Sequence, residues 1–467
     1  MDHIVKPYRM IDRNAIRRYI DNTMPLQEVW QLLTMCSDLH PDDAFCMREF
    51  NLGFQRHDGA DGYSRFHQFD SLEAFKRELL RRAPARIDVG AILSTETDYM
   101  PLGITWRQVE AYEKEPVIDI DVDDYADVRS CNCSGKMLCA QCWHFLATAA
   151  SIVNYLMEEK FGCNRIMWIY SGRRGVHGWI LDQSAAHYPE SFRHAIADYL
   201  STFQVNRDHR VFSGTCKVAL SSYESIVLPQ FEELVRREVV LMRNTKIMTY
   251  ITKIALGTET KNMTLLRALM SSAKPEMNNM SLWNHYKLVL QQHHPAAQQV
   301  IRTIVFSLVF PRIDRNVTTA MKHLIKCPYS WHPRTGAICV PFDVYSAHEF
   351  DPTCAPNLHD PSSLSDFWKW SRPIQLLLRE NSELARRMVC IECCDLQQPL
   401  SKLPLYIVFN DPEEWEEHQR THDHTMAYTA DNSRLHNLVV LMCGNKTGSE
   451  RQALKRIFYD QLSERLL

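Results

Sequence analysis

The segment VIDIDVDDY, residues 117–125, restricts what this chain can fold into more than any other segment. Its apolar residues at positions 117, 118, 120 and 122 are β-branched, which is typical of a strand. Asp119, Asp121 and Asp123 recur at every second position. Side chains alternate across a strand, so all three carboxylates are expected on one face. Because like charges repel, the pattern predicts a positive group between them.

A divalent cation is the first candidate for that group. Two carboxylates in an Asp-x-Asp strand lie less than about 7 Å apart and suit hard ions such as Mg²⁺. Two such ions, about 3.5–4 Å apart, can activate an attacking oxygen and stabilise a leaving one. Asp314, in the strand-like run PRIDRNV, is the candidate third ligand. The alternative is a strand with a solvated acidic face, but the apolar neighbours favour a core strand.

A basic segment, SGRRGVHGW at 171–179, has the composition of a strand-turn-strand unit. Its two glycines permit a tight turn, and Arg173 and Arg174 offer planar groups that match phosphate oxygens. A second basic segment, MKHLIKCPYSWHP at 321–333, carries Lys322, His323, Lys326 and His332. Alone, either segment could be a solvated turn or an ordinary polar surface. Together with the acidic strand, they indicate nucleoside triphosphate chemistry.

Four cysteines lie within twelve residues in SCNCSGKMLCAQCW, directly after the acidic strand. They are Cys131, Cys133, Cys139 and Cys142. The C-x-x-C spacing of the last pair is usual for structural zinc, whereas the C-x-C spacing of the first is less standard. The chain has 15 cysteines, an odd number that argues against a complete disulfide framework. We therefore expect a closed Zn²⁺ site that pins the loop between strand and helix.

The tail offers a second zinc candidate. Cys390 and Cys393 form a C-x-x-C pair, and His418 and His422 follow at helical i, i+4 spacing. The order resembles a two-Cys, two-His finger with a long intervening loop. The alternative is a buried or reactive cysteine pair beside an exposed polar helix.

The whole chain has the composition of a globular protein: 467 residues, 45% hydrophobic, with a formal net charge of −3. Any anion-binding surface must therefore be local. The charged N-terminal segment lacks the apolar core of a signal peptide, and the apolar run 304–310 is too short to span a bilayer, so we expect no membrane association. Strand-like and helical runs alternate up to residue 185, and 186–300 is mostly helical in pattern.

The order of these motifs resembles the catalytic small subunit of eukaryotic and archaeal DNA primase, within the archaeo-eukaryotic primase superfamily. The matching strings are DID, the four-cysteine cluster followed by Trp, YSGRRGVHGW, PRID and HLIKCPYSWHP, and they cover roughly two-thirds of the chain. The resemblance implies an α/β (α+β) fold: a primase core around a mixed sheet, with a zinc-binding loop, an inserted helical subdomain and a C-terminal extension. The expected boundaries are 1–185 for the first part of the core, including the zinc motif 131–142, then 186–300 for the helical subdomain, 301–350 for the second part of the core, and 351–467 for the extension.

The resemblance also assigns roles by position. It implies Asp119, Asp121 and Asp314 as ligands of two Mg²⁺ or Mn²⁺ ions, and Glu49, in REF, as a residue tied to initiation. Asp123 stands where relatives commonly have a non-acidic residue. The implied nucleotide-contacting positions are Arg65, Arg86, Asp88, Ser171, Gly172, Arg173, Arg174, Gly175, Val176, His177, His323, Leu324, Ile325, Lys326 and His332.

The function implied is synthesis of short RNA primers from ribonucleoside triphosphates on single-stranded DNA during replication. The implied partners are a large iron–sulfur subunit and the DNA polymerase alpha complex, and the implied location is the nucleus. Two alternatives stay open. One is a primase-polymerase that uses deoxynucleotides in damage tolerance or organelle replication, and the other is a zinc-stabilised nucleic-acid-binding scaffold without activity.

Overall fold

A computed structural model describes residues 10–55, 61–94, 109–131, 133, 138–182, 185–201, 221–256, 268–269, 274–375 and 377–378, and three strands of the tail. Contacts along the chain define two compact units. The first comprises residues 1–187 and 196–377, and the second comprises 188–195 and 378–467. The strands of the second unit form one antiparallel sheet in the order β10-β11-β9. They are β9 (Leu405–Val408), β10 (Thr425–Ala427) and β11 (Leu438–Met442).

The first sheet of the large unit is antiparallel and has the order β2-β1-β3-β4, with β8 also paired to β3. Its strands are β1 (Arg48–Gln55), β2 (Asp61–His67), β3 (Arg86–Leu93), β4 (Ala111–Glu113) and β8 (Ile325–Lys326). Strand β3 is buried along almost its whole length. It therefore lies in the core, between β1 and the two short strands.

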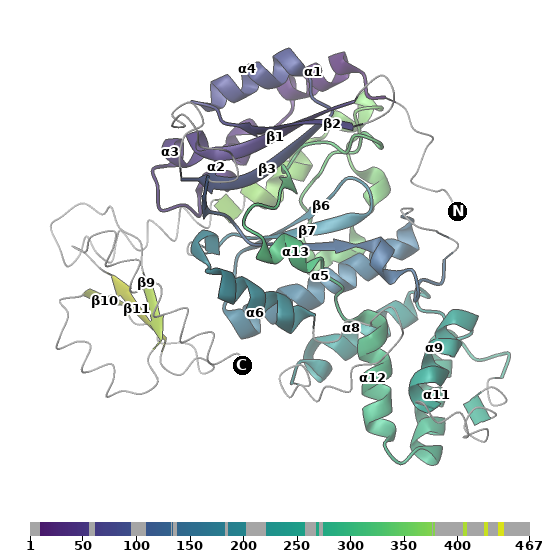
Figure 1. Ribbon diagram of the computed structural model, residues 1–467. Helices are drawn as coiled ribbons and strands as arrows, with labels where there is room; N and C mark the ends of the chain where they lie inside the picture. Colours follow the sequence, from purple (N-terminus) through teal and green to yellow (C-terminus); the bar gives the residue numbers. More distant parts are fainter. Residues whose placement is uncertain are drawn as a thin grey trace. The chain divides into compact units, whose positions relative to one another are not determined.

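Four helices accompany this sheet (Figure 1). They are α1 (Arg13–Asn22), α2 (Leu26–Thr34), α3 (Pro41–Cys46) and α4 (Leu72–Arg82). Helix α4 begins where the Ser71 hydroxyl accepts the backbone N–H of Ala74, as its N-cap position predicts. Aromatic rings of Phe45, Phe50 and Phe75 meet between helices and sheet, with centroids 4.7–5.9 Å apart. This layer is apolar packing beside the strand that carries Glu49.

The second sheet is antiparallel in the order β5-β7-β6. Its strands are β5 (Val117–Asp121), β6 (Ile166–Tyr170) and β7 (Gly175–Ile180). Helix α5 (Ala140–Phe161) packs against this sheet and is buried on most of its surface. It ends at Gly162, whose φ of 66° is the left-handed conformation that glycine tolerates best.

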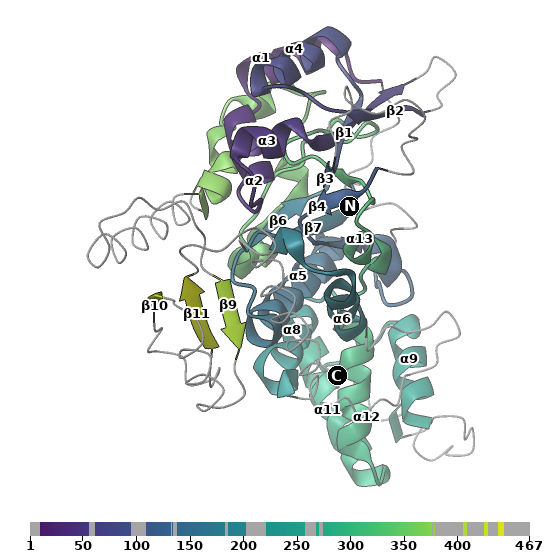
Figure 2. The same ribbon diagram turned by 60° about the vertical axis from the view of Figure 1, so that its left-hand side comes forward.

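A group of helices packs beside α5 and extends away from both sheets (Figures 1 and 2). It contains a π-helical turn (Tyr223–Val227), α8 (Leu228–Arg236), α9 (Thr245–Leu256), α11 (Asn279–His293) and α12 (Ala297–Val309). Helix α6 (Glu190–Leu200) precedes this group in the chain. Buried rings such as Phe231 and Trp283, 4.9 Å apart, form its core. The described part of 186–300 is thus helical, as its pattern predicts.

The chain then returns to the sheets through α13 (Arg315–Thr319) and β8. Short 3₁₀ turns complete the large unit: Val122–Tyr125, Ala185–His187, Val344–Glu349, Pro352–Cys354 and Pro361–Leu364. None of the described helices combines the length and the apolar composition that a membrane span needs.

The α/β class is confirmed, and the described strands all pair antiparallel within separate sheets. Two features of the strands do not follow from the sequence patterns above. The apolar run 337–344 makes hydrogen bonds to β6 through Val340 and Phe342 but contributes only an isolated bridge between Ile169 and Pro341. Strand β1 over the segment REFNLGFQ was not anticipated as a strand. The domain boundaries given above stay predictions.

A buried ion pair connects the first sheet to the segment between β4 and β5. Arg48 of β1 binds Glu115 through both terminal nitrogens, at 2.7 and 2.8 Å, and both side chains are almost fully buried. Arg48 also donates to the carbonyls of Leu33 and Gly90. Because Glu115 lies two residues before β5, this pair helps to hold the two sheets together.

Replacing Arg48 with Met should lower the free energy of unfolding by about 3–5 kcal/mol, because Glu115 would stay buried without its partner. Denaturant titration followed by circular dichroism measures the loss. The double variant Arg48→Met/Glu115→Leu should recover part of it. Glu78→Gln, which removes a more exposed pair with Arg81, should cost about 1 kcal/mol or less. A double variant as unstable as the single one would contradict this explanation.

Candidate active site

The carboxylates of Asp119 and Asp121 lie on one face of β5. In the antiparallel register Asp119 is opposite His177 and Asp121 is opposite Gly175 of β7. Strand β5 ends at Asp121, and Asp123 lies in the 3₁₀ turn that follows. The expectation of three equivalent carboxylates on one strand was therefore wrong for Asp123.

Asp314 comes to the same place from a distant part of the chain. It is the N-cap of α13 rather than a strand residue, and its side chain accepts the backbone N–H of Asn316 at 3.0 Å. Its own N–H donates to the carbonyl of Asp119 at 2.9 Å. The hydroxyl of Thr318 adds a hydrogen bond to the carbonyl of Val117. Helix α13 is therefore fixed against β5, with Asp314 exposed beside Asp119.

The pKa of the Asp119 carboxyl is raised to about 8, first by burial and then by the charges of Asp121 and Asp314. Burial also raises the pKa of Asp121, against the opposing effect of Arg174. Asp119 Oδ1 is buried and has no hydrogen-bond partner. Oxygen ligands of this kind fit a hard cation such as Mg²⁺ or Mn²⁺. The sulfur atoms of the four cysteines all lie within 4.8 Å of one another. Among the described residues, the three carboxylates do not form such a close group.

Arg174 lies against the acidic segment. Its guanidinium is 2.9 Å from Asp121 Oδ2 and 2.5 Å from Asp123 Oδ2. The positive group that the sequence pattern predicted is thus, in this structure, an arginine from the neighbouring turn.

That turn, residues 171–175, connects β6 to β7 and is closed by hydrogen bonds. The N–H of Ser171 donates to the carbonyl of Gly175, and the N–H of Gly175 donates to the Ser171 hydroxyl at 3.0 Å. Gly172 has a φ of 80°, and a Cβ there would lie 2.7 Å from the carbonyl oxygen of Ala337. A Cβ at Gly175 would collide with the Asp121 carboxylate. Both glycines are therefore required by close packing.

A second turn, residues 332–336, packs on the first. Thr335 Oγ1 donates to the carbonyl of Gly172 at 2.7 Å. The N–H of Arg334 donates to His332 Nδ1 at 3.2 Å, so the proton of the neutral ring is on Nε2. Burial, followed by the charges of Lys326 and Arg173, lowers the pKa of His332 and favours this neutral form.

Cations without carboxylate partners gather between the two turns. Arg173 Nε is buried without a partner, and burial followed by the charge of Arg334 lowers the pKa of Arg173. Lys326, nearly buried in β8, donates to the carbonyl of Ser171 at 3.2 Å, and burial lowers its pKa. Burial and then Lys326 lower the pKa of His177 to about 3, so its ring is neutral although it lies 3.6 Å from Asp119. Such a group of cations suits an anion that enters from solvent.

A further set of paired charges lies on the first sheet. Arg65 binds Glu49 at 2.8 Å, and burial raises the pKa of Glu49 against the effect of Arg65. Arg86 binds Asp88 at 2.6 Å, and Asp88 is opposite Lys326 in the β3–β8 register. The charges of Asp88 and Asp119 both act to raise the pKa of Lys326, against the larger effect of burial. This lysine therefore lies near both the acidic residues of β5 and the charged pairs of the first sheet.

Three predicted positions, Val176, Leu324 and Ile325, have apolar side chains that cannot bind phosphate as these cations can. The side chains of Val176 and Ile325 are buried in the core, so only their backbone is available. His323 has a buried Nδ1 without a partner, next to Leu324, which is half-buried. Sequence reasoning missed Asn51, which donates to Asp88 at 2.9 Å, and also Thr335 and Arg334. The T-G that follows His-Pro-Arg, a turn signal, could have directed attention to Thr335.

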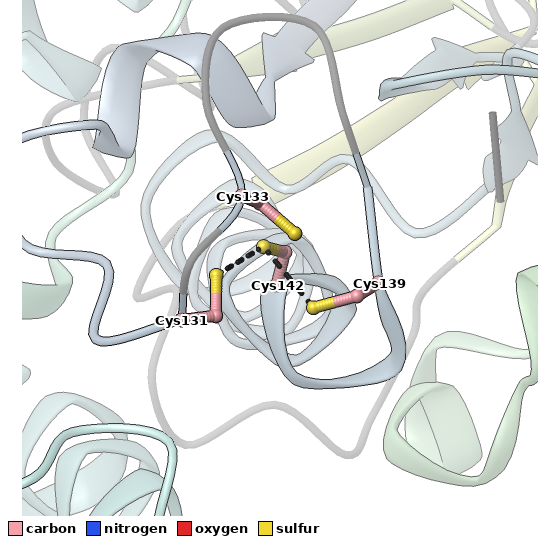
Figure 3. A group of neighbouring side chains, drawn as sticks. All are labelled: Cys131, Cys133, Cys139 and Cys142. Carbon is pink, nitrogen blue, oxygen red and sulfur yellow. Dashed lines mark hydrogen bonds between the residues drawn. The ribbon is translucent and has the colours of Figure 1, made fainter. Parts of the chain in front are cut away.

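The four cysteine thiols point toward a common centre between the loop and the start of α5 (Figure 3). Cys142 Sγ is 2.9 Å from Cys131 Sγ and 3.5 Å from Cys139 Sγ. Cys139 is the N-cap of α5, and Cys142 lies in its first turn. Burial and the neighbouring thiols raise the pKa of Cys133 to about 12. Four thiolates this close together would therefore need a cation between them. The donor set and its closeness fit a structural Zn²⁺ ion. Cys390, Cys393, His418 and His422 lie outside the described residues.

Replacing Asp119 with Asn should stabilise the ion-free protein at alkaline pH. A folded-state pKa of about 8 exceeds the unfolded value of about 3.9. The native chain therefore binds the extra proton, and the contribution of Asp119 to stability falls as pH rises between these values. The melting temperature of the variant should exceed that of the wild type by about 2 °C at pH 8, and by less at pH 5.

Thermal unfolding in chelator-treated buffer measures this difference. Added Mn²⁺ should stabilise the wild type much more than Asp119→Asn. The matched control is Asp127→Asn, which removes a carboxylate paired with Arg312 and should lower the melting temperature. A variant less stable than the wild type at every pH would contradict the burial argument.

Replacing Cys142 with Ser should abolish zinc binding, because one of four thiolate ligands is lost from a closed site. Zinc per chain, determined by mass spectrometry of purified protein, should fall from about one to near zero, and the melting temperature should fall with it. Cys163→Ser removes a buried thiol outside the cluster and should leave the zinc content unchanged. Equal zinc in both variants would refute the assignment.

Comparison with known proteins agrees with the motifs. A family model described as DNA primase small subunit matches residues 118–344. The chain is 30% identical to the DNA primase small subunit of Drosophila melanogaster over 346 residues, which cover 70% of this chain and 76% of that protein. It is 28% identical to the one of Schizosaccharomyces pombe over 75% of this chain and 77% of that protein. It is 25% identical to that of Methanothermobacter thermautotrophicus over 66% of this chain and 86% of that protein. A match of this extent confirms the resemblance stated above, and the chain belongs to the DNA primase small subunit family.

Proposed function

We propose that this chain is the catalytic subunit of a DNA primase. It would synthesise short RNA primers de novo on single-stranded DNA from ribonucleoside triphosphates. The observation that carries the proposal is that the buried carboxylates of β5 and the exposed Asp314 of α13 meet cations of the turns 171–175 and 332–336 for which the described residues offer no carboxylate partner. A metal-bound triphosphate is a substrate that needs both groups, because the carboxylates would hold the metal ion and the cations would hold the phosphates.

The reaction joins two nucleotides. The 3′-hydroxyl of one attacks the α-phosphorus of the next, the bond to the β-phosphate oxygen breaks, and pyrophosphate leaves. Mg²⁺ or Mn²⁺ ions at Asp119, Asp121 and Asp314 would lower the pKa of the attacking hydroxyl and stabilise the leaving oxygens. Asp119 suits this role because its free oxygen is already desolvated.

The basic residues would hold the triphosphate. Among the described residues, Arg173 Nε has no partner and the ammonium group of Lys326 donates to the carbonyl of Ser171, so both can turn toward phosphate oxygens. His332 would donate from Nε2, since its Nδ1 is occupied by the N–H of Arg334. These groups would offset charge that builds on the leaving pyrophosphate.

The charges on the first sheet would serve the other nucleotide. Glu49 and Arg65 form a half-buried pair beside β2, and Arg86 and Asp88 form a second pair next to Lys326. We infer that Glu49 acts at the initiation step and that Arg65, Arg86 and Asp88 contact a nucleotide, as the family resemblance implies.

A primase-polymerase that uses deoxynucleotides is the alternative within enzymes. Comparing the incorporation of ribo- and deoxynucleoside triphosphates on a single-stranded template separates the two. Detectable dinucleotide synthesis would exclude a non-catalytic scaffold. We further infer from the family that the chain acts in the nucleus with a large iron–sulfur subunit and the DNA polymerase alpha complex.

Asp121→Asn and the double variant Asp119→Ala/Asp121→Ala should make no detectable primers on poly-dT with ATP and Mg²⁺ or Mn²⁺, because the ion ligands are lost. The matched control is Asp123→Thr, two residues further along, which should still make primers. Gel electrophoresis of radiolabelled products measures both. Primer synthesis by the purified double variant would show the carboxylate assignment to be wrong.

A further inference from the structure

Arg174 has two carboxylate partners in the nucleotide-free site, whereas its neighbour Arg173 has none among the described residues. We propose that Asp123 is a positioning residue that holds Arg174 on the carboxylate side, so that an incoming triphosphate must compete with Asp123 for this arginine. This latch, the Asp123–Arg174 pair, rests on the proposed function and sets the KM for nucleotide.

The backbone leaves only the side chain of Arg174 free to move. The carbonyl of Arg174 accepts the N–H of Val122 at 2.9 Å, and the turn that carries it is closed by Ser171 and Gly175. The guanidinium is 29% exposed, and Asp123 is 28% exposed. Solvent and ligands can therefore reach the pair, and rotation of the arginine side chain is enough to transfer it from one anion to another.

The 3₁₀ turn after β5 creates the second partner. On a continued strand, Asp123 would point in the same direction as Asp121, about 7 Å further along. The turn at Val122–Tyr125 instead returns the Asp123 carboxylate to the guanidinium, at 2.5 Å. Each terminal nitrogen of Arg174 then binds a carboxylate on a different element.

The two partners of Arg174 differ in what happens when substrate binds. Asp121 Oδ2 cannot accept the guanidinium and coordinate a cation with the same lone pair, so a bound ion would displace that contact. Asp123 is not needed for the ion and would keep Arg174. Asp123 also adds a negative charge next to the path of a negatively charged substrate. Both effects weaken nucleotide binding, and both disappear when Asp123 is neutral.

Steady-state primer synthesis on poly-dT with varied ATP tests the latch. Asp123→Asn keeps the shape of the side chain without its charge, and it should lower the KM for ATP by about two- to fivefold, as expected for loss of a partly exposed ion pair. The kcat should change by less than the KM. Asp123→Glu keeps the charge and should restore a KM near that of the wild type. The control Glu233→Gln removes a carboxylate paired with Arg236 and Arg237 on α8 and should leave KM unchanged.

A double-mutant cycle shows whether Asp123 acts through Arg174. Binding of ribose-labelled ATP with Mn²⁺, followed by fluorescence anisotropy, should tighten on Asp123→Asn in the wild-type background but not in the Arg174→Ala background. A KM that is unchanged or raised by Asp123→Asn, or an effect that persists without Arg174, would overturn the latch. A wild-type chain that neither binds ATP nor makes primers would overturn the proposed function and the latch with it. An active enzyme indifferent to Asp123→Asn would overturn the latch alone.

Discussion

Negative charge held out of water at one end of β5 is the constraint on which this site depends. Burial and mutual repulsion raise the pKa of Asp119 to about 8, with Asp121 and Asp314 as the main neighbours. Carboxylates in such surroundings are unfavourable unless cations offset them. Two nearby elements each supply one: the turn 171–175 supplies Arg174, and β8 supplies Lys326. These basic residues therefore offset the buried negative charge within the protein itself.

The site is assembled from two sheets, so its geometry depends on how they are fixed to each other. Arg48 and Glu115 connect them through a buried pair, and Lys326 of the first sheet donates to the carbonyl of Ser171 at the end of the second. The first contact precedes β5, and the second lies within the site. A buried ion pair often stabilises a protein no more than an apolar contact would, because both charges lose their hydration. Its advantage here is direction: a two-pronged hydrogen bond fixes orientation, which apolar contacts do not.

Local signals in the sequence predicted those elements whose cause is local. Strand β3 has the bounds of the largely apolar run RIDVGAIL, and α4 begins after Ser71, a residue type favoured as a helix cap. The cysteine spacing predicted a cluster that the structure assembles. Asp314 was misplaced because PRIDRNV is strand-like only in composition. Its cap is a local contact with the N–H of Asn316, whereas its place in the site follows from the hydrogen bond of its own N–H to the carbonyl of Asp119, nearly two hundred residues away. Asn51 was missed because its contact with Asp88 is one that no local pattern encodes, and the turn signal at Thr335 could show a turn but not the contact with Gly172.

Asp123 shows how a difference of two residues in strand length changes the chemistry. Had β5 continued, three carboxylates would share one face and all could serve a cation. Because the strand ends at Asp121, the third carboxylate turns back to Arg174 and becomes a competitor of the substrate instead of a ligand. The same arrangement bears on Asp121. This residue holds Arg174 with Oδ2, an oxygen that a cation would also use, whereas Asp123 holds the other terminal nitrogen of the same arginine. The end of β5 therefore decides which carboxylates could serve an ion and which one holds the arginine.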